Sequence, residues 1–537
     1  MDTGAGSASL STLARPDSTK SMSDVLHQLT SLVREHAAEW SSEYDVRITS
    51  DERRSRMSAF IGRVLDGEHI VETDLPLVAE LLYYTGSQRQ AAALGLVLPL
   101  YNTFEDYDVN TIQPWTIPPQ ERPVVPGKRW SLLGHEIDFP IGVPASALTG
   151  NAEWIGLLAG AGYNVLTFKT VRTREWAPHP APNWVFVTDN SDAFEVGTVT
   201  TARTVIGSTD GWSPTESVGG NTANSFGVPS PGPRQWMAQV AAALDRLSSG
   251  QMLIVSVMGY DYEGTGDPDV LAADYRDAAL LAAEAGAPVI ELNLSCPNSL
   301  SDDIVAAPLC EDPALVRRIV GKVRRDLPQN VKLVVKLSYL RFEALESLVN
   351  SLGASVDGYA GINTVQCEVR TLDGGHAFPG RNLAGVSGKI IHDLALDFVT
   401  SLARIRSIGQ HTFDILGMGG VTSPAAFENM YNAGASVVQS ASGVFLDLFL
   451  SQKCIDAFGA SLPAVPPVVD DVVLSNLTST IRKVLDRSGG RLDIFALSSA
   501  LPVPAMQVRD VLNYMNREKI VEAHTTNAGV VRYILNA

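Results

Sequence analysis

The chain has 537 residues, of which 59 are acidic and 41 basic, giving a formal net charge of -18. Hydrophobic residues make up 45% and charged residues 19% of the chain, a composition typical of globular proteins and not of disordered or fibrous ones. Binding to nucleic-acid phosphates requires a basic surface, so this charge disfavours nucleic acid as the main partner. We therefore expect two or three domains that act on a small molecule.

The N-terminal part predicts a leader followed by a small helical domain, and its sequence indicates no function. Residues 1–23 are rich in Ser, Thr, Gly and Ala, which predicts a disordered leader, with no signal peptide and no membrane span. Residues 24–126 predict a helical domain, from apolar residues at helical spacing, followed by a Pro-rich connector. The four cysteines are widely separated and form no Cys-x-x-Cys pair, so we expect no metal site and a reducing, cytoplasmic compartment.

Residues 127–460 alternate between short apolar segments and helical patterns. About eight strands separated by helices predict an α/β fold, a (β/α)8 TIM barrel with insertions, in which chemistry collects at the carboxyl ends of the strands. Residues 468–537 predict two helices and a hairpin, a winged-helix-like domain. Acidic and basic residues nearly balance there, which favours a packing or protein-contact module over a DNA reader.

Residues 291–298 read Glu-Leu-Asn-Leu-Ser-Cys-Pro-Asn, a strand that runs into a turn carrying one thiol between two carboxamides. Asn293 and Asn298 can each donate and accept hydrogen bonds, so together they can hold a planar ring with amide groups. Cys296 lies between them, where an acidic thiol can act as a base. An isolated cysteine of this kind is more often a buried structural residue, so the interpretation depends on the other strand ends.

Glycines and small polar residues recur at these strand ends. The turn from Gly417 to Gly420 precedes a helix expected near Ser423, and Ala441 and Ser442 follow the next strand. Glycines could merely permit tight turns, but two adjacent loops of this type at the end of a barrel favour a phosphate site. Lys336 lies in a predicted strand over 331–337, where the barrel interior is otherwise apolar and a buried ammonium group needs a partner.

Together these residues resemble the dihydroorotate dehydrogenases, especially the soluble class that uses cysteine, and also the flavin domain of dihydropyrimidine dehydrogenase. The resemblance covers about residues 130–450. It implies an FMN enzyme in which Cys296 removes a proton from a dihydropyrimidine while hydride passes to the flavin. The substrate-binding residues that it implies are Asn224, Phe226, Gly227, Val228, Asn293, Asn298, Asn363 and Thr364. The FMN-binding residues that it implies are Ala145, Ser146, Lys169, Thr170, Asn293, Lys336, Asn363, Gly385, Ser387, Gly388, Gly417, Gly419, Gly420, Ala441 and Ser442.

The resemblance further implies that Lys336 approaches N1 of the flavin and that the loop from Asn224 to Pro229 receives a ring carboxylate on its backbone N–H groups. We expect a homodimer and leave the electron acceptor open. Departures from the family, a β-rich insertion at 196–206 and the run 299–303 after Asn298, keep other substrates open, such as a related lactam or another dihydropyrimidine of a specialised pathway. A flavin-binding regulator that uses the C-terminal domain is a further alternative, and a catalytically inactive scaffold is the least favoured.

Overall fold

The computed structural model describes most of the barrel region and parts of both ends of the chain. The described residues are 22–48, 51–71, 74–85, 96–97, 100–101, 105–112, 122–123, 125, 127–187, 194, 204–208, 213–214, 220–295, 308–371, 373–466, 480–485, 491–493, 497, 511–512, 515, 521–525 and 531–535.

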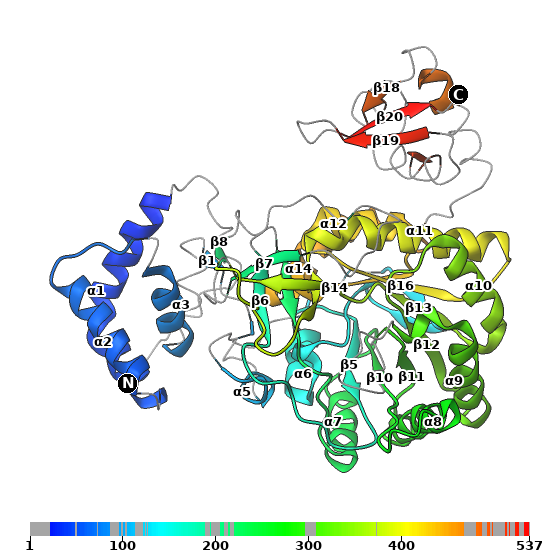
Figure 1. The fold of residues 1–537 in the computed structure, drawn as a ribbon, viewed down its shortest axis with the longest axis horizontal. Coiled ribbons are helices and arrows are strands. Elements are labelled where there is room, and N and C mark those ends of the chain that lie inside the picture. The colour runs from blue at the N-terminus through cyan, green and yellow to red at the C-terminus, as the bar shows by residue number, and fades with distance from the viewer. Residues whose placement is uncertain are drawn as a thin grey trace.

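Eight parallel strands close into a barrel (Figure 1). In chain order they are β4 (Ile141–Val143), β5 (Val165–Val171), β10 (Met252–Val257), β11 (Val289–Asn293), β12 (Lys332–Lys336), β13 (Gly358–Gly361), β16 (Asp414–Met418) and β17 (Val437–Gln439). Each strand pairs with the next, and β17 closes the ring on β4. The predicted (β/α)8 barrel is confirmed.

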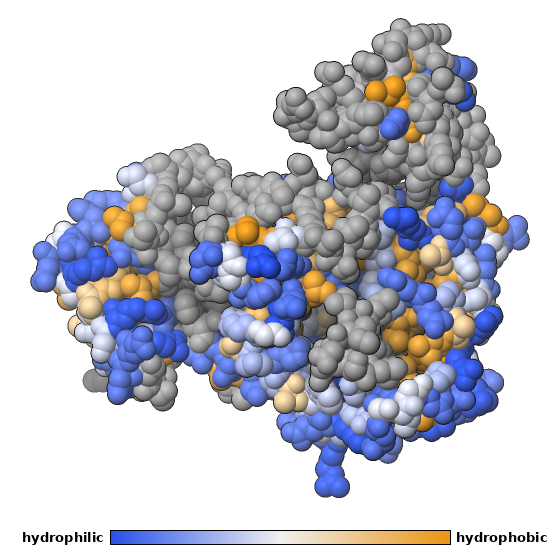
Figure 2. All heavy atoms as spheres, in the orientation of Figure 1, coloured by the Kyte–Doolittle hydropathy of each residue, from blue (hydrophilic) through white to orange (hydrophobic). Residues whose placement is uncertain are grey.

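Helices cover the outside of the barrel because their apolar faces pack against its strands. These helices are α6 (Ala152–Gly160), α7 (Pro233–Leu244), α8 (Pro268–Glu284), α9 (Pro313–Asp326), α10 (Phe342–Leu352), α11 (His392–Ile408), α12 (Pro424–Asn432), α13 (Ser442–Leu446) and α14 (Leu450–Phe458). In Figure 2 the surface over α7 and α8 is largely hydrophilic, whereas hydrophobic atoms gather over the part of the barrel that holds β11, β12 and α9.

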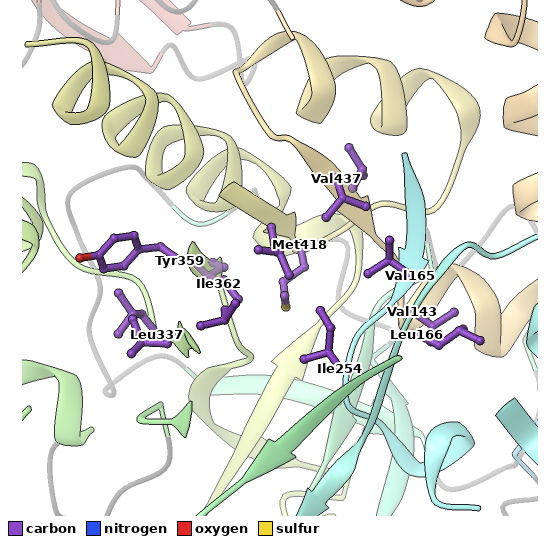
Figure 3. Close-up of a cluster of buried hydrophobic side chains, with 14 of the residues drawn as sticks. Val143, Val165, Leu166, Ile254, Leu337, Tyr359, Ile362, Met418 and Val437 are labelled. Atoms are coloured by element: carbon purple, nitrogen blue, oxygen red, sulfur yellow. The ribbon is translucent and has the colours of Figure 1, made fainter. Parts of the chain in front are cut away.

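Apolar side chains fill the inner half of the barrel. Figure 3 shows Val165, Ile254, Met418 and Val437, from four different strands, gathered in one buried cluster. Side chains alternate between the two faces of a strand, so the residue two positions after a core residue also points into the barrel, closer to the carboxyl end of the strand. Those positions carry the polar residues of the site.

A short hairpin, β2 (Trp130–Leu132) with β3 (His135–Ile137), precedes β4. The sequence of residues 137–143 predicts one strand, but the structure divides this stretch between β3 and β4. Pro140 has no N–H to donate to a sheet, and the chain turns between β3 and β4. The Asp138 N–H donates instead to the carbonyl of Gly250 at 3.0 Å, which ties the hairpin to the segment before β10.

Two insertions after barrel strands form a second closed sheet of five strands. Its strands are β6 (Trp184–Val187), β7 (Thr204–Ser208), β9 (Thr222–Asn224), β14 (Val365–Arg370) and β15 (Leu383–Ser387). The first three follow β5 and the last two follow β13, so both insertions leave the barrel at the carboxyl ends of its strands. The sheet therefore stands at the mouth of the barrel, and β9 and β15 pair there, with Asn224 opposite Gly385.

Three N-terminal helices, α1 (Met22–Arg47), α2 (Asp51–Leu65) and α3 (Leu75–Tyr84), enclose their own hydrophobic core. Glu80 is buried within it and accepts hydrogen bonds from Tyr44 Oη at 2.6 Å, Arg53 Nε at 2.7 Å and Arg56 Nη2 at 2.9 Å. This carboxylate, surrounded by donors, fastens α3 to the other two helices.

Smaller elements complete the fold. Between the helices and the barrel lie β1 (Leu96–Val97), paired with β8 (Ser213–Pro214), and α5 (Tyr107–Ile112). At the C-terminus, residues 480–485 are helical, and β18 (Arg491–Asp493), β20 (Val531–Leu535) and β19 (Val521–Thr525) form an antiparallel sheet in that order. Most of the rest of the predicted winged helix and residues 1–21 of the predicted leader lie outside the described residues, whereas the last two leader residues, Met22 and Ser23, already belong to α1. Within the described ranges, no helix combines the length and the apolar character needed to cross a bilayer.

Candidate functional site

The carboxyl-terminal half of the barrel interior is polar. Glu291 on β11 lies beside Ser256 on β10, and Asn293, two residues further along, lies beside Lys336 on β12. Residues opposite one another in parallel strands point to the same side, so these side chains share the interior with the apolar cluster below them. The buried polar residues of this layer are Thr167, Thr170, Ser256, Glu291, Asn293, Lys336 and Gln439.

Lys336 and Glu291 form the charged centre of this layer. Their exposed fractions are 3% and 0%. Burial raises the pKa of the Glu291 carboxyl, while the positive charge of Lys336, and to a smaller degree the Ser256 hydroxyl, oppose that rise. Neither carboxylate oxygen of Glu291 has a partner with hydrogen-bond geometry in the described part of the chain. Lys336 is therefore a buried cation in this layer, and Glu291 is its nearby buried counter-charge.

Ser295 joins two of the predicted substrate residues. Its Oγ donates to Asn293 Oδ1 at 2.6 Å and accepts from Asn363 Nδ2 at 2.6 Å. Asn293 Nδ2 continues the network to Thr170 Oγ1 at 3.3 Å. The carboxamides thus have fixed orientations and come from the ends of β11 and β13. The sequence analysis did not select Ser295, although it stands directly before Cys296 and a hydroxyl can link a donor to an acceptor.

Thr170 reaches this network because β5 contains a bulge. The pairing with β10 runs from Val255 opposite Phe168 to Val257 opposite Val171, so β5 carries one extra residue there. Such a bulge redirects a side chain and is common beside active sites. Thr170 lies 3.0 Å from Ser256 through their hydroxyl oxygens.

The predicted phosphate loops come together. Ser442 Oγ donates to Ser387 Oγ at 3.1 Å, which joins the start of α13 to the end of β15. Gly388 and Gly420 have φ angles of 98° and 67°. A Cβ on Gly388 would lie 2.1 Å from the Gly220 carbonyl oxygen, and one on Gly420 would lie 2.7 Å from the Gly388 carbonyl oxygen. Only glycine fits these positions, so the loops approach each other through bare backbone.

The loop from Asn224 to Val228 has unpaired backbone donors. Among the described residues, none accepts a hydrogen bond from the N–H groups of Phe226, Gly227 or Val228. Gly227 and Val228 have φ angles of 78° and 50°, a succession that can turn neighbouring N–H groups to one side, as in anion-binding nests. These residues are only half-buried, so a ligand can reach them.

Two side chains missed by the sequence analysis hold this loop from one side. Arg381 Nη1 donates to the Ser225 carbonyl at 2.8 Å, and its Nη2 donates to the carbonyls of Pro180 at 3.0 Å and Pro182 at 2.7 Å. The ring of His179 lies against Gly227. Burial and then the charge of Arg381 lower the pKa of His179, so the imidazole is neutral at pH 7. Neither residue belongs to a pattern that could have shown its role in the sequence.

The remaining predicted site residues fall into two groups. Those placed at the barrel mouth are Ala145 and Ser146, Lys169 at the end of β5, Thr364, Gly385, Gly417, Gly419 and Ala441. Thr364 touches the backbone at Gly385, whose added Cβ would lie 2.2 Å from Thr364 Oγ1. Cys296 and Asn298 lie outside the described residues, and their roles stay predictions. In the described ranges, no group of three or more His, Cys, Asp and Glu residues could hold a metal ion.

Comparisons with known proteins indicate one family. A family model described as dihydroorotate dehydrogenase matches residues 186–462, more than half of the chain. A dihydroorotate dehydrogenase of Dictyostelium discoideum is 31% identical over 338 residues, which cover 61% of this chain and 87% of the relative. The catalytic subunit of a dihydroorotate dehydrogenase B (NAD(+)) from Methanocaldococcus jannaschii is 27% identical over 229 residues, 42% of this chain and 67% of that protein.

Proposed function

Because the chain belongs to the dihydroorotate dehydrogenase family, we propose that it is an FMN-dependent dehydrogenase that oxidises dihydroorotate at a CH–CH bond. Two observations carry this proposal together: the loop from Asn224 to Val228, in which three N–H groups have no acceptor among the described residues, and the carboxamide network of Asn293 and Asn363. Dihydroorotate has a carboxylate, which the loop N–H groups would bind, and ring amides, which the two carboxamides would bind. An uncharged dihydropyrimidine would leave the loop donors unused.

The residues present fit FMN in two respects. The loops around Gly388 and Gly420 approach each other through bare backbone beside the hydroxyls of Ser387 and Ser442, and glycines together with hydroxyl groups suit a phosphate. Lys336 would stabilise the negative charge that a flavin ring gains on reduction. Gln439 Oε1, which is buried and has no partner in the described residues, offers the flavin ring a hydrogen-bond acceptor. When bound, FMN supplies the hydride acceptor of the reaction.

The chain's own residues supply the remaining chemistry. In this proposal Cys296 takes a proton from the ring carbon next to a carbonyl, and the neighbouring ring carbon releases a hydride, so the ring gains one C=C bond. Asn293 and Asn363, oriented by Ser295, hold the ring amides in one plane. Orientation of this kind raises the rate because the reacting groups are already held in the geometry that the reaction needs.

The proposal is tested by an anaerobic titration of the purified protein with dihydroorotate, followed by flavin absorbance. We expect dihydroorotate to bleach the flavin and dihydrouracil, which lacks the carboxylate, to bleach it far more slowly. Equal bleaching by both compounds would indicate a different dihydropyrimidine as substrate. A protein that binds FMN but is bleached by neither would contradict the proposed reaction.

A glycine substitution tests the phosphate loops. Gly388→Ala is expected to lower FMN affinity at least tenfold, because the new methyl group collides with the Gly220 carbonyl and strains a φ of 98°, a combined cost of about 1–3 kcal/mol or more. FMN retention is measured by flavin fluorescence after dialysis. The control is Gly380→Ala in the connection between β14 and β15, where φ is 74° but nothing lies within 4 Å of the new Cβ. Equal FMN retention by the two variants would argue against a phosphate at Gly388.

A further inference from the structure

Two tyrosines from the segment before the barrel pack on the proposed carboxylate loop. The ring centroid of Phe226 lies 5.6 Å from that of Tyr101 and 5.4 Å from that of Tyr107, in tilted arrangements. Tyr101 is 1% and Tyr107 7% exposed, whereas Phe226 is half-buried. The side of Phe226 that solvent would otherwise reach is therefore covered by residues that belong to neither the barrel nor its insertions.

Tyr101 is also joined to the loop by hydrogen bonds. Its Oη donates to Asn183 Oδ1 at 2.7 Å, and the backbone carbonyl of Asn183 accepts from the Ser225 N–H at 2.9 Å. The Leu100 N–H donates to the carbonyl of Phe445 at 2.6 Å, in the helix α13 that begins with Ser442. One short segment thus contacts both the proposed carboxylate loop and the proposed phosphate region.

Tyr107 is held by the first turn of α5, which is fastened to the barrel. Trp154 Nε1 donates to the Asn110 carbonyl at 3.1 Å, and Asn151 Nδ2 donates to the carbonyl of Thr111. Both partners belong to the start of α6, just after the predicted cofactor residues Ala145 and Ser146. Because α5 has little freedom to move, the ring of Tyr107 presents a fixed surface to Phe226.

A second set of contacts holds the backbone of the loop from Asn224 to Val228. Arg381 and the Asn183 carbonyl hold Ser225, His179 N–H donates to the Phe226 carbonyl at 3.0 Å, and Arg172 Nε donates to the Val228 carbonyl at 3.0 Å. The loop carbonyls are thus fixed from within the barrel and its insertions, while the Phe226 ring packs on Tyr101 and Tyr107 at the edge of the hydrophobic core. Loss of those rings would leave a cavity beside Phe226, and the loop backbone with its N–H groups would shift toward it.

We propose that Tyr101 and Tyr107 are positioning residues, which hold Phe226 so that the three loop N–H groups converge on a substrate carboxylate. Residues 100–101 and 105–112 are then part of the substrate site, although they touch no reacting atom. This inference rests on the proposed function, since it assigns the loop to the carboxylate of dihydroorotate. It gives the N-terminal part of the chain a role in specificity for a carboxylated ring.

The test compares binding of orotate and uracil to the FMN-loaded protein, measured by the change in the flavin spectrum. Tyr107→Ala is expected to raise the Kd of orotate by about tenfold to a hundredfold and to change the Kd of uracil, which has no carboxylate, less than twofold. In turnover, KM for dihydroorotate should rise by the same factor while kcat changes little, because the contact acts alike in ground and transition states. Tyr107→Phe keeps the ring and should restore wild-type values.

Tyr101→Phe removes only the hydroxyl bonded to Asn183, so it keeps the test available if Tyr107→Ala fails to fold. We expect it to raise the Kd of orotate severalfold with normal FMN content. Unchanged orotate affinity in both variants, or an equal loss of orotate and uracil affinity, would overturn the positioning role. A wild-type protein that binds no orotate would instead contradict the proposed function, so the two failures are distinguishable.

Discussion

Cys296→Ala is expected to lower the turnover of dihydroorotate by about 10²–10⁴-fold, the usual contribution of a positioned general base. FMN content and the Kd of orotate should stay within twofold of wild type, because the substitution removes only a thiol. The wild-type kcat should rise with pH as the thiol ionises, and this rise should be absent from the residual rate of the variant. Stopped-flow reduction of the flavin over a range of pH measures both effects.

The matched control is another cysteine of the same region. Cys310 is buried, and its backbone N–H donates to the Leu294 carbonyl at 3.0 Å, so it lies next to the strand that leads to Cys296. Burial raises its pKa to about 11, which keeps its thiol protonated at neutral pH and unsuited to act as a base. Cys310→Ala should therefore retain the wild-type pH dependence. Full turnover by Cys296→Ala would remove the thiol from the mechanism.

The barrel could be predicted from the sequence because its strands are short, apolar and separated by helices. For a parallel sheet buried on both faces, such runs are a strong signal. The five-stranded sheet at the mouth could not be predicted. Its strands come from two insertions nearly 140 residues apart, and β7 pairs with β14 only in the folded chain. Local patterns carry no information on such pairing.

The site likewise contains residues that could be predicted from the sequence and residues that could not. Asn293, Lys336 and the glycine turns stand at strand ends, where a general rule for barrels assigns function. Glu291 stands in the same octapeptide, but an isolated glutamate in a strand gives no sign that it will face the barrel interior with no hydrogen-bond partner in the described residues. Tyr101 and Tyr107 lie before the barrel, and only the tertiary contact with Phe226 relates them to the loop.

Several expectations stay predictions. The homodimer, the electron acceptor and the part played by the C-terminal region are untested by the fold, and most of residues 468–537 lie outside the described ranges. A regulator that binds DNA would still require a basic surface, which the sequence of this region does not supply. The disordered leader and the altered run 299–303 likewise stay expectations from the sequence.

Lys336→Met is expected to lower both the stability of the protein and the reduction potential of its flavin. Without the ammonium group, Glu291 is a buried carboxyl with no compensating charge, and removal of one partner of a buried pair typically costs about 3–5 kcal/mol. The cost should grow with pH. Burial already raises the folded-state pKa of Glu291, loss of Lys336 raises it further, and a raised carboxyl pKa loses stability as pH increases above the unfolded value. Urea unfolding at pH 5.5 and pH 8 measures this difference.

Two comparisons separate the electrostatic role of Lys336 from a packing role. The double variant Lys336→Met/Glu291→Leu should regain most of the stability and lose its pH dependence, because both buried charges are gone. Its flavin potential should nevertheless stay more than about 30 mV below wild type, equal to about 1.4 kcal/mol for two electrons, since no cation remains to stabilise the reduced ring. Lys332→Met, on the same strand but paired with Asp357 at 3.0 Å at the other end of the barrel, should leave the potential unchanged. A wild-type potential in both Lys336 variants would mean that this lysine holds Glu291 and does nothing for the flavin.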